Sequence, residues 1–160
     1  STVSKALVDC LQCGHYDIDD DLTPEYIDKV QRGEELSEDD IYSHLIGTVL
    51  PKLKLLPNDK TTVVAGILGN MKCITQISSE APEIIFINLE AHYDVLKERV
   101  LSRDHFAGVP SLDHCWTIQH ELKAPGYCID VTQKSVEQIV DECIEIIKTL
   151  PNTSRQLQER

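Results

Sequence analysis

A run of carboxylates, Asp17-Ile18-Asp19-Asp20-Asp21, is the part of the sequence best suited to chemistry. Crowded carboxylates repel one another and raise one another's pKa values, so folding alone does not favour such a run. The cluster could act as a base, bind the hydroxyl groups of a substrate or serve a Mg²⁺-associated role. The alternative is a solvated acidic turn before a helix, and the residues alone leave both interpretations open.

Two arginines, Arg99 and Arg103, stand four residues apart. That spacing places both on one face of a helix, where two guanidinium groups could clamp a phosphate. Salt bridges from these arginines to Glu90 or Glu98 on the helix surface are the alternative.

The segment that follows the arginines, residues 105–110, contains glycine, proline, His105 and Phe106. A basic and aromatic loop between two helices could be a lid that closes over a substrate and excludes water. An ordinary loop with Phe106 in the core is the alternative. Five histidines lack a ligand spacing or a triad context and are expected to be structural or exposed: His15, His44, His92, His114 and His120.

Six cysteines are present, and Cys10 and Cys13 form a C-x-x-C pair. A zinc site would need a second close pair of Cys or His, which the sequence does not offer at suitable spacing. Because the chain is long enough for a core of its own and shows no signal peptide, we expect reduced thiols and a cytoplasmic protein.

The composition limits the classes of function. The 160 residues carry 15 Lys and Arg against 27 Asp and Glu, a formal net charge of −12. An acidic chain is unsuited to binding nucleic acid or an anionic membrane, and no apolar stretch approaches the roughly 20 residues of a membrane span. We expect one domain over residues 1–150, with a lid at about 103–125 and a polar tail at 151–160.

The pattern of the chain predicts strands that alternate with helices. Apolar or β-branched runs predict strands at residues 15–19, 61–68, 84–89 and 127–131, and amphipathic spacing predicts helices at 2–12, 24–31, 37–50, 92–103, 111–123 and 135–147. A kink is expected at Pro51. This alternation is typical of an α/β fold, a parallel sheet with helices on both faces. Ligands of such folds bind at the carboxyl ends of the strands, where Asp17, Asp19 and Asp20 would lie.

Several motifs in a fixed order resemble the gluconokinase family, small P-loop sugar-acid kinases related in fold to shikimate kinase. Ser1-Thr2-Val3 resembles the end of G-x-x-x-x-G-K-S-T, and Tyr16-Asp17-Ile18-Asp19-Asp20 matches Y-D-x-D-D. Further matches are Pro24, Gly33, Leu36 and Asp40 in the next segment, Arg99, Arg103, His105 and Phe106 in R-L-x-x-R-x-G-H-F with one residue fewer, and Leu122 and Pro125 in L-E-x-P. The resemblance covers almost the whole chain.

This resemblance implies a three-layer P-loop kinase fold that transfers the γ-phosphate of ATP to D-gluconate and gives 6-phosphogluconate. It implies that Ser1 contacts Mg²⁺, that Ser1 and Thr2 belong to the phosphate loop, and that Asp19 accepts the proton of the substrate hydroxyl. Asp17 and Asp20 would bind the substrate, Arg99 and Arg103 would neutralise ATP phosphates, and His105 and Phe106 would belong to the lid.

Departures from the family pattern leave two alternatives open. Ile41 stands where the family has Arg, His44 at a Trp-like position and Leu22 where the family has His. The chain could therefore be an inactive homologue that binds or regulates, or a kinase of the same fold with another small hydroxylated substrate. We also expect the glycine loop upstream of Ser1. Without it the sheet would lack its central strand, and the open strand edges would favour a homodimer.

Overall fold

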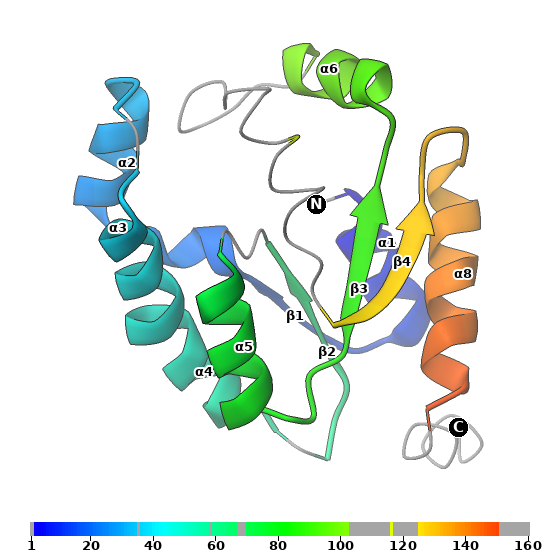
Figure 1. The fold of residues 1–160 in the computed structure, drawn as a ribbon. Coiled ribbons are helices and arrows are strands. Elements are labelled where there is room, and N and C mark those ends of the chain that lie inside the picture. The colour runs from blue at the N-terminus through cyan, green and yellow to red at the C-terminus, as the bar shows by residue number, and fades with distance from the viewer. Residues whose placement is uncertain are drawn as a thin grey trace.

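The computed structural model describes residues 2–34, 36–57, 59–66, 70–102, 116 and 125–150 (Figure 1). Its helices are α1 (Thr2–Leu11), α2 (Pro24–Gln31), α3 (Glu38–Tyr42), α4 (Leu50–Leu55), α5 (Met71–Glu80), α6 (Tyr93–Leu101) and α8 (Val136–Lys148). Its strands are β1 (Gly14–Asp17), β2 (Thr62–Ala65), β3 (Phe86–Glu90) and β4 (Gly126–Asp130). A 3₁₀-helix, η1 (Ile18–Asp21), follows β1, and a π-helix, η2 (Ser43–Val49), joins α3 to α4.

The four strands form two parallel pairs. β1 pairs with β2 from Gly14↔Thr62 to Asp17↔Ala65, and β3 pairs with β4 from Phe86↔Gly126 to Glu90↔Asp130. The predicted parallel α/β class is thus confirmed. One continuous sheet is not formed by the described strands, because no ladder of hydrogen bonds joins one pair to the other in that part of the chain.

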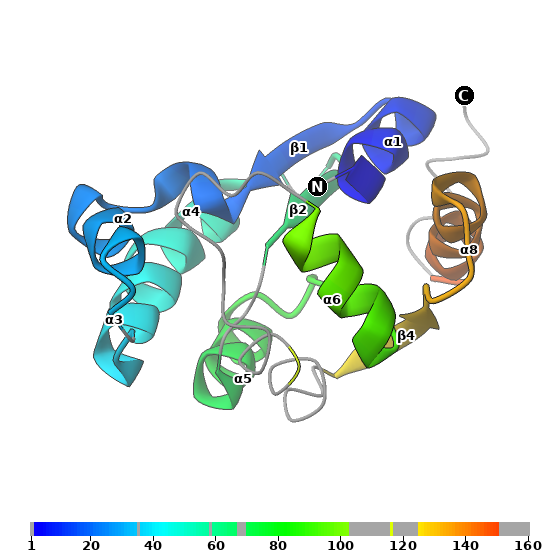
Figure 2. The ribbon, with the colours of Figure 1, turned by 90° about the horizontal axis from the view of Figure 1, so that it is seen from above.

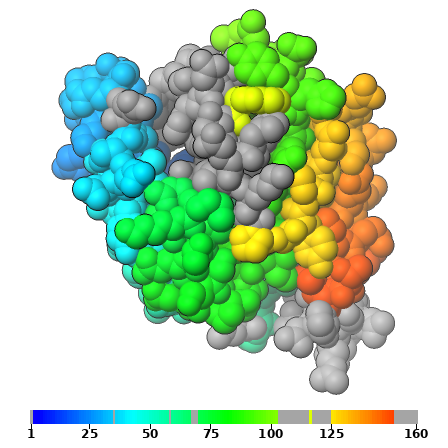
Figure 3. Space-filling view, in the orientation of Figure 1, coloured from blue at the N-terminus to red at the C-terminus, as the bar shows by residue number. Residues whose placement is uncertain are grey.

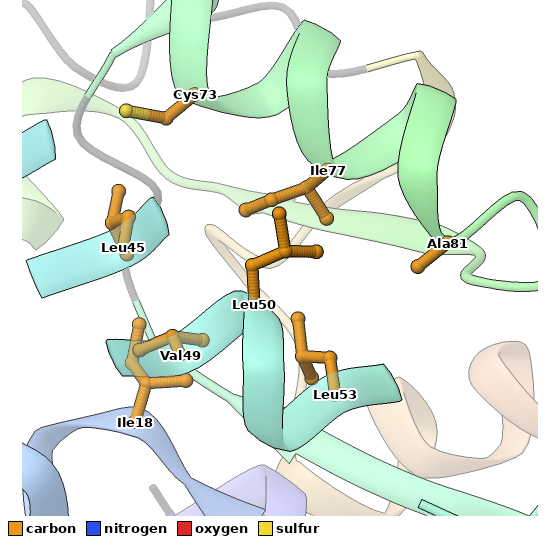
Figure 4. Packing of buried hydrophobic residues seen from close by; sticks show 8 residues of the cluster. All are labelled: Ile18, Leu45, Val49, Leu50, Leu53, Cys73, Ile77 and Ala81. Carbon is orange, nitrogen blue, oxygen red and sulfur yellow. The ribbon is translucent and has the colours of Figure 1, made fainter. Parts of the chain in front are cut away.

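Two core clusters pack against the strands. The first core cluster consists of Ile18, Leu45, Val49, Leu50, Leu53, Cys73, Ile77 and Ala81 (Figure 4). Tyr16 and Phe86 pack against it. The second core cluster consists of Leu7, Ala91, Ile129, Val131, Ile139, Val140 and Cys143, with Val63 and Ile87 packed against it. Each cluster therefore touches both strand pairs.

The helices lie on both sides of the strands. α1 packs against α8, β1 and β2, and α5 packs on η2 in the first core cluster. Figures 1 and 2 show α5 on one side of the strands and α1 with α8 on the other. The space-filling view shows α5 in green on the near face and α8 in orange along one edge (Figure 3).

Side-chain caps explain where several helices begin. Thr23 caps α2 by accepting from the Tyr26 N–H, with Pro24 at the first helical positions. Ser135 and Gln138 form a capping box at the start of α8. The helices predicted at 24–31 and 135–147 are confirmed with nearly the same bounds.

Two strands end two or three residues earlier than predicted, at Asp17 and Ala65. The strand expected at 15–19 ends at Asp17, because the Asp17 carboxylate accepts a hydrogen bond from the Asp19 N–H and starts the turn of η1. The strand expected at 61–68 ends at Ala65, and Gly66 then takes a positive φ of 152°. Such a φ belongs to glycine and interrupts the strand.

The chain remains helical through Pro51, which lies in the first turn of α4 directly after the π-helix. Proline lacks an N–H, so the helical hydrogen-bond pattern changes most easily at this point. The lid expected at about 103–125 and the helix expected at 111–123 lie outside the described residues, except for Trp116 and Pro125. The tail at 151–160 also lies outside them.

Candidate functional site

The carboxylate run lies at the carboxyl end of β1, where the sequence predicts it. Ile18 is 2% exposed and anchors η1 in the first core cluster. The two residues after Ile18, Asp19 and Asp20, are exposed. Burial of this one apolar side chain therefore presents the neighbouring carboxylates to solvent at the strand end.

Asp19 has the electrostatic character of a base. Its pKa lies above the ordinary value, first because surrounding protein desolvates the carboxyl group and second because Asp17 is close. The charge of His44 acts in the opposite direction. A carboxylate with a raised pKa accepts a proton more readily than an ordinary aspartate, as general base catalysis requires.

Asp21 has a structural role that the sequence analysis did not predict. Its Oδ2 atom accepts a hydrogen bond of 2.6 Å from the Tyr16 hydroxyl, and its Oδ1 atom forms an ion pair with Lys52 of α4. The hydrogen bond from Lys52, and then that from Tyr16, lowers the pKa of Asp21. Burial and Asp21 together raise the pKa of Tyr16. The last carboxylate of the run thus joins β1, η1 and α4.

His44 was expected to be structural or exposed, and the structure places it beside the carboxylate run. It is 7% exposed, and the ring of Tyr26 lies 5.5 Å from its own ring, at an interplanar angle of 52°. Burial lowers the pKa of His44, while Asp19 and Asp21 act to raise it. Nothing in the local sequence indicates this, because the contact depends on η1 packing against η2.

Arg99 lies on α6, at the carboxyl end of the other strand pair. Its Nη2 atom donates a hydrogen bond of 3.1 Å to the carbonyl oxygen of Val131, just after β4. Among the described residues, Arg99 forms no salt bridge with Glu90 or Glu98. The guanidinium group is thus half-buried at a strand end, in the region where the sequence predicts a phosphate site.

Thr132 connects the end of β4 to the start of α6. Its Oγ1 atom accepts from the His92 N–H at 3.0 Å, and its own N–H donates to the Asp130 carboxylate at 2.9 Å. These contacts fix the helix that carries Arg99 relative to β3 and β4.

The remaining predicted site residues divide into two groups. Thr2 is exposed at the first position of α1, and Asp17 is partly buried at the end of β1. Ser1, Arg103, His105 and Phe106 lie outside the described residues. Within the described part of the chain, no three His, Cys, Asp or Glu side chains converge as a metal site. No helix in that part is long and apolar enough to cross a membrane.

Comparisons with known proteins connect this arrangement to sugar kinases. No family model matches the chain, and no curated protein matches it. Among solved structures, an unliganded sugar kinase from Janibacter sp. HTCC2649 matches with a TM-score of 0.75 and 19% identity, over 95% of this chain and 89% of that one. A gluconokinase from Sinorhizobium meliloti 1021 matches with a TM-score of 0.71 and 20% identity, over 99% and 86%.

At this level of identity the comparisons show a shared fold. The chain therefore has the fold of these sugar kinases, and both neighbours support the resemblance to gluconokinases in the sequence motifs.

Proposed function

We propose that this chain is an ATP-dependent carbohydrate kinase that phosphorylates gluconate or a similar small hydroxylated acceptor. One observation carries the proposal. Within a fold shared with sugar kinases, the accessible carboxylate of Asp19 lies at a strand end and has a raised pKa. Kinases of this kind use such a carboxylate to orient and deprotonate the acceptor hydroxyl.

In the proposed reaction, Asp19 accepts the proton of the acceptor hydroxyl as that oxygen bonds to the γ-phosphorus of ATP. The bond between the γ-phosphorus and the oxygen of ADP breaks. Asp17 and Asp20 bind other hydroxyl groups of the acceptor. For gluconate, the product is 6-phosphogluconate.

The nucleotide side of the proposal rests on cations and hydroxyl groups. Arg99 and Arg103 neutralise the charge on the ATP phosphates, while His105 and Phe106 close over the site. Mg²⁺ prefers oxygen ligands and takes several of them from nucleotide phosphates and water. The hydroxyl groups of Ser1 and Thr2 fit that preference, and Ser1 is the proposed ligand. When bound, Mg²⁺ neutralises phosphate charge that develops during transfer.

We also propose that the two strand pairs are halves of one continuous parallel sheet. Helices on both faces of that sheet would then make a three-layer fold. A further parallel strand between β2 and β3 would satisfy an edge of each pair and lie between the two core clusters. A segment upstream of Ser1 or a second copy of the chain could supply it. Sedimentation distinguishes these sources, because a monodisperse monomer contradicts the second.

A coupled assay of ADP release with MgATP and gluconate tests the proposed function. We expect turnover by the full-length protein, and a loss of about 100-fold or more in kcat for Asp19→Asn. Wild-type activity in Asp19→Asn would overturn the assigned base. A protein without turnover whose melting temperature does not respond to millimolar MgATP would be an inactive homologue, since a ligand stabilises a fold that binds it.

One observation favours a second candidate, a kinase of the same fold with an uncharged polyol as acceptor. Lys52 and Lys29, which come from helices beside the carboxylate run, are already paired with Asp21 and Asp40. A buried acceptor carboxylate needs a cation, whereas hydroxyl groups do not. A panel of sugar acids and polyols discriminates the two, because a higher kcat/KM for an uncharged polyol than for gluconate supports this second candidate.

A further inference from the structure

His44 is a buried polar side chain that the proposed reaction does not use. It is 7% exposed, and neither of its ring nitrogens has a hydrogen bond of good geometry among the described residues. The Ile18 backbone lies close enough to raise the pKa of the ring, but the contact falls short of that geometry. A buried polar group without a hydrogen-bond partner destabilises the folded state. A leucine at this position would avoid that cost, so packing alone gives no reason for a histidine.

The packing of two short helices brings His44 to the carboxylate run. Ile18 of η1 lies in the first core cluster with Leu45 and Val49 of η2 (Figure 4). Ile18 precedes Asp19 and Leu45 follows His44, and Asp19 and His44 are near enough for the charge of each to act on the pKa of the other. A π-helix such as η2 is rare and often occurs at functional sites.

The charged groups around His44 come from several elements. Asp19 and Asp21 of η1 both act on its charge, and Tyr26 of α2 lies against its ring. The neighbouring helices carry further titratable groups. Asp40 of α3 is paired with Lys29, and Lys52 of α4 is paired with Asp21. On α5, Cys73 lies in the first core cluster and Lys72 lies over the Tyr42 ring. The others are Glu25 and Asp28 of α2, Glu38 and Asp39 of α3, Lys54 of α4 and Glu80 of α5. Because Asp21 is already bound by Tyr16 and Lys52, Asp19 is the carboxylate that remains for the imidazole.

We propose that His44 is a positioning residue for Asp19. When an acceptor fills the site, an imidazole N–H donates a hydrogen bond to one carboxylate oxygen of Asp19 and holds the other oxygen toward the acceptor hydroxyl. This inference rests on the proposed function, in which Asp19 is the base. The lowered pKa of His44 agrees with it, because a neutral imidazole keeps one N–H to donate.

Kinetics of His44→Leu and His44→Gln test this role. We expect His44→Leu to lower kcat by about 10- to 100-fold, as the loss of an orienting partner commonly does, with an unchanged KM for ATP. Its stability should equal or exceed that of the wild type, because an apolar side chain removes an unsatisfied group. His44→Gln keeps an N–H donor and should recover part of the lost kcat.

An NMR titration of the histidine side chains gives a readout that does not need activity. The signal of His44 is the one that disappears in His44→Leu. The negative charge of Asp19 raises the pKa of His44, so Asp19→Asn should lower this pKa. Asp20→Asn is the matched control, since it removes the adjacent carboxylate, and the pKa of His44 should remain close to that of the wild type.

The outcomes separate this inference from the proposed function. Full activity in Asp19→Asn overturns the assigned base and with it the role of His44, but leaves the kinase activity standing. A protein with no turnover overturns the proposed function and this inference together. A loss of activity in Asp19→Asn together with a wild-type kcat in His44→Leu overturns the role of His44 alone. A pKa of His44 that does not change in Asp19→Asn also overturns it.

Discussion

The hydroxyl of Tyr16 donates a 2.6 Å hydrogen bond to the carboxylate of Asp21, five residues along the chain. Tyr16 belongs to β1 and Asp21 ends η1, so the bond closes the turn that presents Asp19 and Asp20. Lys52 neutralises the same carboxylate from α4. One carboxylate of the run thus stabilises the arrangement in which Asp19 and Asp20 remain accessible.

Tyr16→Phe is expected to lower the free energy of unfolding by about 0.5–1.5 kcal/mol, because it removes one hydrogen bond and keeps the ring in the core. Urea unfolding at neutral pH measures the change. Tyr127→Phe on β4 is the control, since this tyrosine is 39% exposed and its substitution should change stability by less than about 0.5 kcal/mol. Equal stabilities of Tyr16→Phe and wild type would show that the bond contributes nothing net.

The pH dependence of stability provides a second test of the same carboxylate. Lys52 lowers the pKa of Asp21 more than any other group does. A carboxyl group whose pKa is lowered by folding stabilises the protein above its unfolded pKa, and this contribution is lost as the pH falls through the folded value. Lys52→Met should therefore flatten the loss of stability between about pH 5 and about pH 2.

Urea unfolding at neutral pH and at several acidic pH values measures this slope. Lys97→Met, on the exposed surface of α6, is the control for the removal of one positive charge and should keep the wild-type slope. Parallel curves for wild type and Lys52→Met would contradict the assigned cause of the shift.

Much of the fold follows from patterns that the sequence displays directly. Helix starts such as Thr23-Pro24 and Ser135 depend on the residues next to them, so they could be predicted closely. The end of β1 could not be predicted, because the strand stops where the Asp17 carboxylate accepts a hydrogen bond from the Asp19 N–H, and the sequence does not show whether this bond forms. The π-helical pattern of η2 likewise has no separate signal in the amphipathic spacing of residues 37–50.

The carboxylates of the candidate site could be predicted from the sequence. The residues that contact them could not. The run of acidic residues after a predicted strand is visible in the sequence, which left a functional cluster and a solvated turn both open. The burial of His44 depends on the contact of η1 with η2, between residues far apart in sequence, and the pairing of Asp21 with Lys52 spans 31 residues. Arg99 was expected on one helical face together with Arg103, and its hydrogen bond to Val131 depends on how α6 docks beside the end of β4.

Arg99→Met tests the two roles of that arginine. Loss of the hydrogen bond to Val131 should lower the free energy of unfolding by about 1 kcal/mol without nucleotide. If Arg99 also neutralises ATP phosphates, the rise in melting temperature caused by MgATP should be smaller than in the wild type. Lys97→Met on the same helix controls for charge, and an undiminished rise in Arg99→Met would leave Arg99 with the structural role alone.

Gly66→Ala should disturb the site through packing. Gly66 has a φ of 152°, and an added Cβ would lie 2.0 Å from Cγ1 of Ile18. Ile18 is 2% exposed and is followed directly by Asp19. We expect a loss of about 1–3 kcal/mol in the free energy of unfolding and a lower kcat, because the side chain that anchors η1 must move. Urea unfolding and the ADP-release assay measure the two effects.

Gly47→Ala is the matched control, because an added Cβ at Gly47 in η2 meets no atom within 4 Å. Alanine favours helices over glycine, so this variant should be more stable by up to about 1 kcal/mol. The double variant Gly66→Ala with Ile18→Ala should lose less stability than the sum of its single variants, by about 0.5–3 kcal/mol, since the clash requires both side chains. Strict additivity of the two losses would show that Gly66 and Ile18 do not act through this contact, and the effect on Asp19 would then need another route.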